Sequence, residues 1–306
     1  MDIIRIKQQL WANSHIADKL RDGKYHDTHT QKPDDNIYKG LTPETRKAFD
    51  DAQGGELKGD KRGTPAKMTA LHSSSALCVN VFQYFQDKPN CLKLKLLQEC
   101  GLVSSRNNST VKSFEFEKRF SIKGISTPNI DFVVEVDPYR IIAIESKFNE
   151  PYAYSHDNFL REEYYLPKNK SIWNNLEKLY NALDIENKEE ITQKDSDGND
   201  RMGKIIFPDY KYLDAVQLLK HLLGVVNSSD KKSEIWLTYL WYDSLGGKGV
   251  AHRAEIEDFR KLIEENTSQR IKFRHITYQE LICNLNKNLN RAEHKDYLDY
   301  ITSRYL

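Results

Sequence analysis

The stretch from Phe116 to Tyr152 constrains the fold more than any other part of this 306-residue chain. It predicts the end of one strand and then two more strands, over about 112–122, 129–136 and 140–148. Apolar side chains alternate with charged ones, so each strand is expected to bury one face and to present acidic groups on the other. The sequence therefore predicts a sheet that carries carboxylates.

The register between the second and third strands decides where these carboxylates point. A short turn at 137–139 joins the two strands and favours pairing of Val136 with Arg140. In that register Asp131 lies beside Glu145, and both side chains point to the same face. A slip of one residue would send Asp131 to the opposite face and break up the group.

In the favoured register, two or three carboxylates converge with one ammonium group. Asp131, Glu145 and Glu117 supply the carboxylates, and Lys147 supplies the ammonium. Like charges at this spacing need a cation, and hard oxygen ligands suit Mg²⁺ or Mn²⁺. The carbonyl of Ser146 is a further candidate ligand. A bound metal would activate a water beside a phosphodiester, and the lysine would orient that water or help to deprotonate it.

The alternative for these residues is a hairpin with a solvated polar face, because Glu-x-Lys on a strand also arises by chance. The apolar run at 141–144 argues against that alternative. A strand that is buried on both faces is more suited to ending in a cleft than on an open surface.

Two predicted helices offer supporting residues. A helix over 73–85 carries Asn80, which is either a position at the edge of the core or a polar group aimed at the site. An amphipathic helix over 210–225 carries Gln217 and His221 on one polar stripe. That stripe is either solvated or, if it faces the site, in contact with phosphate.

The rest of the chain predicts an extension, an insertion and a closing set of helices. The predicted parts are an N-terminal extension (1–66) that wraps the core, a main domain (67–306), a helical insertion within it (about 150–205), a central strand (234–242), a flexible turn (245–249) and terminal helices (277–289 and 291–304).

Composition excludes several classes of protein. The chain is 39% hydrophobic and 30% charged with a net charge of +1, which indicates a globular protein without an overall basic character. Four cysteines form no CxxC pair, so reduced thiols are expected and a zinc cluster is not. No apolar run approaches the roughly 18 residues that span a membrane, and no signal peptide is visible, so a cytoplasmic location is expected.

At these residues the sequence resembles the PD-(D/E)XK nuclease superfamily, which has the restriction-endonuclease-like fold. The matching parts are Pro128-Asn129-Ile130-Asp131 and then Glu145-Ser146-Lys147 at the end of the next strand. With 65–82 and 116–117, these parts are also similar to a group of uncharacterised bacterial restriction-endonuclease-like proteins. The resemblance covers roughly residues 55–245.

The resemblance implies an α/β fold with a restriction-endonuclease-like core, in which helices flank a central mixed β-sheet, and metal-dependent phosphodiester hydrolysis. It implies Asp131 and Glu145 as metal ligands, Lys147 as the catalytic lysine and Glu117 as a further ligand or water-positioning acid. Asn80 stands where family members often carry an acidic residue, and Asp131 follows Pro128 by three residues rather than one. Whether one or two metals bind is therefore open.

The expected function is that of a Mg²⁺-dependent endonuclease acting on DNA, in restriction or in defence against foreign DNA. Two alternatives stay open: a non-catalytic nucleic-acid-binding or assembly module of the same fold, and a nuclease directed at RNA. Besides DNA, the expected binding partners include a second copy of the chain or a partner protein of a defence system. No binding to a membrane is expected. Candidates for backbone contact are Lys118, Arg119, Lys123, Lys168 and Lys170, interleaved with Tyr164, Tyr165 and Trp173, although for any single one of them plain solvated surface is the favoured interpretation.

Overall fold

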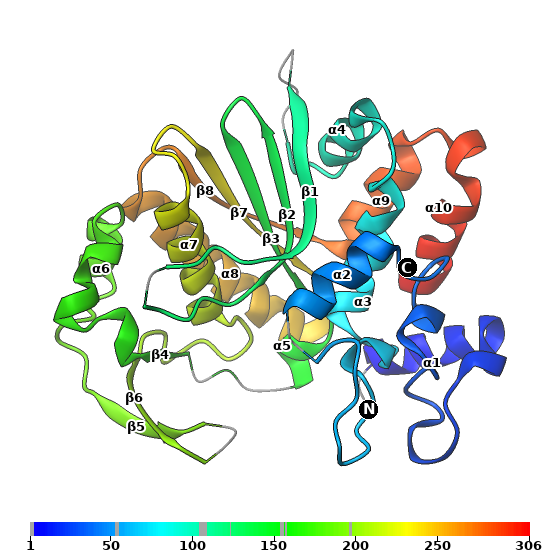
Figure 1. Cartoon of the computed structure of the whole chain (residues 1–306), viewed down its shortest axis with the longest axis horizontal. Helices are drawn as coiled ribbons and strands as arrows, with labels where there is room; N and C mark the ends of the chain where they lie inside the picture. Colours follow the sequence, from blue (N-terminus) through cyan, green and yellow to red (C-terminus); the bar gives the residue numbers. More distant parts are fainter. Residues whose placement is uncertain are drawn as a thin grey trace.

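A mixed β-sheet runs through the centre of the computed structural model, which describes residues 3–52, 55–103, 109–122, 124–153, 156, 158–195 and 198–306. Within these residues the sheet has five strands in the order β1-β2-β3-β7-β8 (Figure 1). Strand β2 is antiparallel to both of its neighbours, β1 and β3, and β7 and β8 continue the sheet parallel to β3. The strands are β1 (Thr110–Lys118), β2 (Ile130–Asp137), β3 (Arg140–Lys147), β7 (Glu234–Trp241) and β8 (Ile271–Thr277).

The β2–β3 ladder has the predicted register. Val136 lies opposite Arg140, and Phe132 lies opposite Ile144. Asp131 therefore sits one step beyond the paired residues, beside Glu145. The predicted central strand is also confirmed, because β7 lies between β3 and β8 and is buried on both faces.

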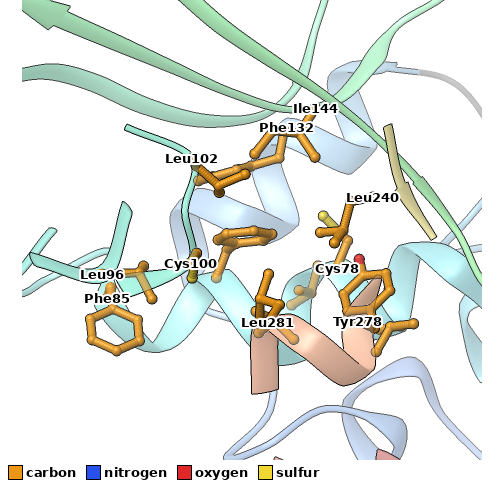
Figure 2. Packing of buried hydrophobic residues seen from close by; sticks show 14 of the residues in the cluster. Cys78, Phe85, Leu96, Cys100, Leu102, Phe132, Ile144, Leu240, Tyr278 and Leu281 are labelled. Carbon is orange, nitrogen blue, oxygen red and sulfur yellow. The ribbon is translucent and has the colours of Figure 1, made fainter. Parts of the chain in front are cut away.

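One face of the sheet is covered by helices from both ends of the chain. Phe82 of α3 stacks on Phe132 of β2 with ring centroids 4.5 Å apart. Cys78 and Tyr278 join the same apolar cluster from two different helices (Figure 2). The helices on this face are α2 (Pro43–Ala52), α3 (Ser74–Phe82), α4 (Asn90–Glu99), α9 (Tyr278–Asn288) and α10 (Arg291–Tyr305).

The opposite face packs against α6 (Glu177–Ala182), α7 (Ala215–Ser228) and α8 (Gly246–Asn266). Helix α7 begins later than predicted, because Asp214 caps it by accepting a hydrogen bond from Gln217 N at 2.9 Å. The flexible turn predicted at 245–249 is wrong, since Gly246 starts α8. A Cβ on Gly249 would lie 2.4 Å from Asp243 Oδ1, so glycine lets this carboxylate pack against the first turn of the helix.

The N-terminal segment lies along α10 and β1. Helix α1 (Ile3–His15) contacts α10, and Phe49 of α2 stacks against Phe116 of β1. The buried Arg304 guanidinium donates to Gln8 Oε1 and to the backbone carbonyl of Asn36. The segment is otherwise built from the short 3₁₀ turns η1 (Ala17–Lys19), η2 (Gly23–Tyr25), η3 (Pro33–Asn36) and η4 (Lys67–Thr69), and a further turn, η5 (Gln83–Phe85), follows α3.

The insertion at about 150–205 is not purely helical as predicted. Beside α5 (Glu150–Ala153), η6 (Glu162–Tyr164), η7 (Pro167–Trp173) and α6, it contains β4 (Phe159–Arg161), β5 (Ile191–Lys194) and β6 (Asp200–Ile205). These strands form an antiparallel sheet in the order β4-β6-β5. They are short and largely polar, so no apolar alternation marks them in the sequence. No helix in the described part of the chain is long and apolar enough to cross a membrane.

Candidate active site

Asp131 and Glu145 come together at the end of the β2–β3 ladder. Asp131 Oδ2 accepts a hydrogen bond from Ser146 N at 2.7 Å, which fixes the carboxylate beside β3. Burial raises the pKa of Asp131 well above its usual range, and the charges of Glu145 and Glu117 raise it further. This carboxylate therefore lies where negative charge is already crowded.

Glu145 is buried between two electropositive partners. Its Oε1 lies 2.7 Å from Lys147 Nζ, and its Oε2 lies 2.8 Å from His221 Nε2. Burial alone would raise the pKa of Glu145, but Lys147 and His221 outweigh it and hold the pKa at about 2. Glu145 is consequently the ionised member of the cluster.

Lys147 is held in its charged form. Burial would lower its pKa, but the carboxylates of Glu145 and Asp131 raise it above the usual range of lysine. Its Nζ also donates to Gln217 Oε1 at 3.0 Å. The ammonium is thus oriented from two sides, by a carboxylate on its own strand and by an amide from α7.

Glu117 reaches the cluster through an unusual backbone conformation. Its φ of +52° lies in the left-handed region, which costs a residue with a side chain on the order of 1–3 kcal/mol. Its Oε2 accepts a hydrogen bond from Asn129 Nδ2 at 3.3 Å. Burial raises the pKa of Glu117 to about 7, and the charge of Glu56 adds to this rise. The left-handed turn breaks the predicted alternation of β1, so Glu115 is exposed while Glu117 is half-buried.

Helix α7 contributes the two predicted supporting residues, and the N-terminal half of the chain adds two that the sequence did not point to. Gln217 and His221 lie one turn apart and contact Lys147 and Glu145; His221 is buried, and Gln217 is half-buried. Asn129 precedes the Ile130-Asp131 pair and could have been suspected from that position. Glu56 lies in a polar stretch without any pattern, so no sequence signal marks it.

Asn80 has a different position from the one considered for it. Its side chain accepts from Tyr38 N at 2.6 Å and donates to Asn36 O at 3.0 Å and to Tyr305 Oη at 2.8 Å. None of the site carboxylates is among these partners. Asn80 instead ties α3 to the N-terminal segment and to the last helix.

Most of the candidates for nucleic-acid contact are either buried or paired with a carboxylate. Tyr164 and Trp173 are buried, so their rings are not open stacking platforms. Lys118 bonds Glu115 and Glu135, and Tyr165 Oη donates to Glu190. Lys170 pairs with Glu186, Arg119 and Lys168 are exposed, and Lys123 lies outside the described residues.

The donor chemistry of the site suits a hard divalent cation, although the side chains are not yet arranged around one. No group of three His, Cys, Asp or Glu side chains in the described ranges is placed to hold a metal ion. However, Glu145 Oε2 is buried without a well-aligned hydrogen bond, as are both ring nitrogens of His221. A buried, ionised oxygen in this state can accept a cation, and the crowding of Asp131 and Glu117 around it favours one.

The sheet and this cluster together define a restriction-endonuclease-like α/β protein. Residues 5–306 match the model of a family described as "Restriction Endonuclease associating with ARP", and the chain belongs to this family. The match confirms the restriction-endonuclease-like resemblance seen in the sequence and supports a nuclease-related role. No curated protein and no solved structure matches the chain.

Proposed function

We propose that this protein is a Mg²⁺-dependent endonuclease that hydrolyses phosphodiester bonds of DNA, in restriction or in defence against foreign DNA in the cytoplasm. The observation that carries the proposal is the cluster around the buried Glu145, in which the half-buried Asp131 and Glu117 have raised pKa values beside a charged Lys147. Burying like charges is costly, and such perturbed groups concentrate at functional sites. We assign the nuclease domain to 67–306 and a wrapping extension to 1–66.

We assign Asp131, Glu145 and the carbonyl of Ser146 as ligands of Mg²⁺, with Mn²⁺ as a substitute. Glu117 would be a further ligand or would position water. When bound, the metal would lower the pKa of a water and stabilise charge on the scissile phosphate. Each oxygen of Glu145 is in contact with one side chain, either Lys147 or His221. One of these two side chains would therefore have to move away from its oxygen before Glu145 could bind the metal.

The Lys147 ammonium would have a second role. It would offset the negative charge of the phosphate and orient the attacking water, and Gln217 accepts a hydrogen bond from the ammonium through its amide oxygen. Because the pKa of Lys147 is raised, the group acts here as a cation and a hydrogen-bond donor.

Metal binding can be tested without any substrate. A ligand at 100 times its Kd stabilises the folded state by about 2.7 kcal/mol. We expect Mg²⁺ and Mn²⁺ to raise the melting temperature over that in EDTA, and Asp131→Asn to abolish the rise. Asp299→Asn, at an exposed ion pair on α10, is the matched control. A rise that survives Asp131→Asn would place the metal elsewhere.

Activity should be assayed on plasmid, linear duplex, single-stranded DNA and RNA, with Mg²⁺, Mn²⁺ or EDTA. Lys147→Ala and Asp131→Ala should each lower the cleavage rate by about 10²–10⁴-fold or more. Lys295→Ala, at an exposed lysine, should leave it unchanged. Cleavage that both site variants retain would refute the assignment.

Two other functions make different predictions in the same assay. A non-catalytic module of this fold would bind nucleic acid without metal-dependent cleavage, and an RNA-directed enzyme would leave all three DNA substrates intact. The family's description names association with ARP. We propose that this chain also works with a partner protein, and light scattering of the purified chain will show whether it forms a homodimer instead.

A further inference from the structure

A polar groove of about 480 Å³ opens beside the candidate active site. Ser126 and Pro128, in the loop that leads to Asp131, line one part of it, and the first turns of α7 line another. Gln217 belongs to this lining and also accepts the hydrogen bond from Lys147. One residue of the groove wall therefore bonds the proposed catalytic lysine.

Another wall is formed largely by one face of the small sheet in the insertion. Arg161 lies opposite Gly203, and Gln193 lies opposite Arg201, so these positions share a face with Phe159. All four side chains line the groove. A Cβ on Gly203 would lie 2.5 Å from Phe159 Cζ, so the glycine leaves room for the half-buried ring to lie directly over the strand.

This wall combines cations with an aromatic ring. Arg161 is exposed, and Arg201 donates from its Nε to Asp195 Oδ2 at 2.8 Å, which restrains the guanidinium. Lys220 adds a third cation from α7, with its Nζ 5.5 Å from the centre of the Tyr164 ring. Three carboxylates also line the groove: Asp195, which holds Arg201, Asp214, which caps α7, and Glu163.

We propose that this groove binds one strand of the nucleic-acid substrate next to the scissile phosphate. Arg161, Arg201 and Lys220 contact backbone phosphates, and a base stacks on Phe159. Cationic grooves with an aromatic platform bind single strands in this way, because every base has a face that can stack. The position of the scissile phosphate rests on the proposed function, whereas strand binding by the groove does not require cleavage.

The test measures binding of a fluorescein-labelled, mixed-sequence single-stranded DNA to the full chain by anisotropy, in EDTA so that cleavage cannot interfere. Each phosphate contact contributes about 0.7 to the slope of log Kd against log salt for a single strand. Arg161→Gln and Arg201→Gln should each reduce this slope by about that amount and weaken binding about 3–10-fold at low salt. Arg→Lys at either position should largely restore the slope.

Arg291→Gln is the matched control, because Arg291 is also an exposed, ion-paired arginine, with its side chain 57% exposed against 49% for Arg201. Phe159→Ala should weaken binding at least about fivefold without changing the salt slope, because stacking releases no counterions. Phe159→Trp keeps a ring and should retain binding, which separates stacking from damage to the small sheet.

The outcomes separate this proposal from the nuclease proposal. If Asp131→Ala abolishes cleavage while Arg161→Gln and Arg201→Gln match Arg291→Gln in Kd and salt slope, the groove proposal is wrong and the nuclease proposal stands. If the wild type shows no cleavage, and the groove variants still lose binding, the nuclease proposal is wrong and the groove proposal stands. The single-strand proposal would also be overturned if the wild type bound duplex DNA more tightly than single-stranded DNA and Phe159→Ala bound the duplex as tightly as the wild type did.

Discussion

Lys147 Nζ donates a hydrogen bond to Gln217 Oε1 at 3.0 Å, across 70 residues of sequence. A neutral amide oxygen orients the ammonium without neutralising it. Helix α7 therefore sets the direction of a charged group that β3 carries. The same helix reaches Glu145 one turn later through His221, so a single rigid element braces both residues of the Glu-x-Lys pair.

Gln217→Ala should slow cleavage more than it weakens substrate binding. Losing one positioning hydrogen bond of about 1.4 kcal/mol lowers kcat about tenfold, and the melting temperature should stay close to that of the wild type. Steady-state kinetics will separate kcat from KM. Gln98→Ala, at an exposed position on α4, is the control. An unchanged kcat would show that Lys147 does not need the amide.

His221→Leu should destabilise the metal-free protein and increase its response to metal. The substitution leaves Glu145 Oε2 buried without an electropositive partner, at a cost of about 2 kcal/mol. A bound Mg²⁺ replaces that partner, so the rise in melting temperature on adding Mg²⁺ should be larger than in the wild type. An equal or smaller rise in melting temperature would mean that His221 and the metal do not contact the same oxygen of Glu145.

Arg304→Ala should destabilise the whole fold. The guanidinium is buried and donates to Gln8, Asn36 and Tyr300, so its removal leaves several buried acceptors unpaired. We expect a loss of about 3–5 kcal/mol in the free energy of unfolding, measured by urea denaturation. Arg291→Ala, at an exposed ion pair, should cost less than about 1 kcal/mol. Equal effects would show that the buried network contributes little.

Acid should weaken the fold through His252. Its ring nitrogens lie 3.1 Å from Tyr152 Oη and Tyr239 Oη, and burial lowers its pKa to about 3. The unfolded chain binds this proton near pH 6.5, so the stabilising contribution is complete above that pH and is lost as the pH falls toward 3.

The size of this acid effect can be isolated with a variant. Between these two pKa values the free energy of unfolding should fall by up to about 1.4 kcal/mol per pH unit from this group alone. His252→Gln cannot titrate, so its stability should decline less steeply between pH 6 and 4. Parallel curves for the two proteins would contradict the burial effect.

The sequence predicts those parts of the candidate site that are local. A short turn between β2 and β3 leaves few registers open, and the apolar face of each strand selects one of them, so Asp131, Glu145 and Lys147 could be placed together. The central position of β7 follows from its continuous apolar run, which is typical of a strand covered on both faces, whereas the mixed sheet was implied by the family resemblance.

The contributions that come from distant segments could not be predicted in the same way. The polar stripe of α7 fits solvent as well as a site, and only packing on β3 and β7 turns Gln217 and His221 inward. Glu56 approaches Glu117 because α2 docks on β1, which no local pattern encodes. Asn80 was ambiguous for the same reason, since its partners lie in the N-terminal segment and in the last helix.

The mixed sheet also imposes an order in time on the assembly of the site. Strands β2 and β3 pair across a short turn, whereas Arg140 and Glu234, at the start of β3 and β7, are 94 residues apart in the chain. Closing the longer loop costs more conformational entropy, and distant pairings form more slowly. During synthesis the carboxylates and Lys147 can therefore come together first. The contacts from Gln217 and His221 of α7 form only once the later half of the chain has folded onto these strands.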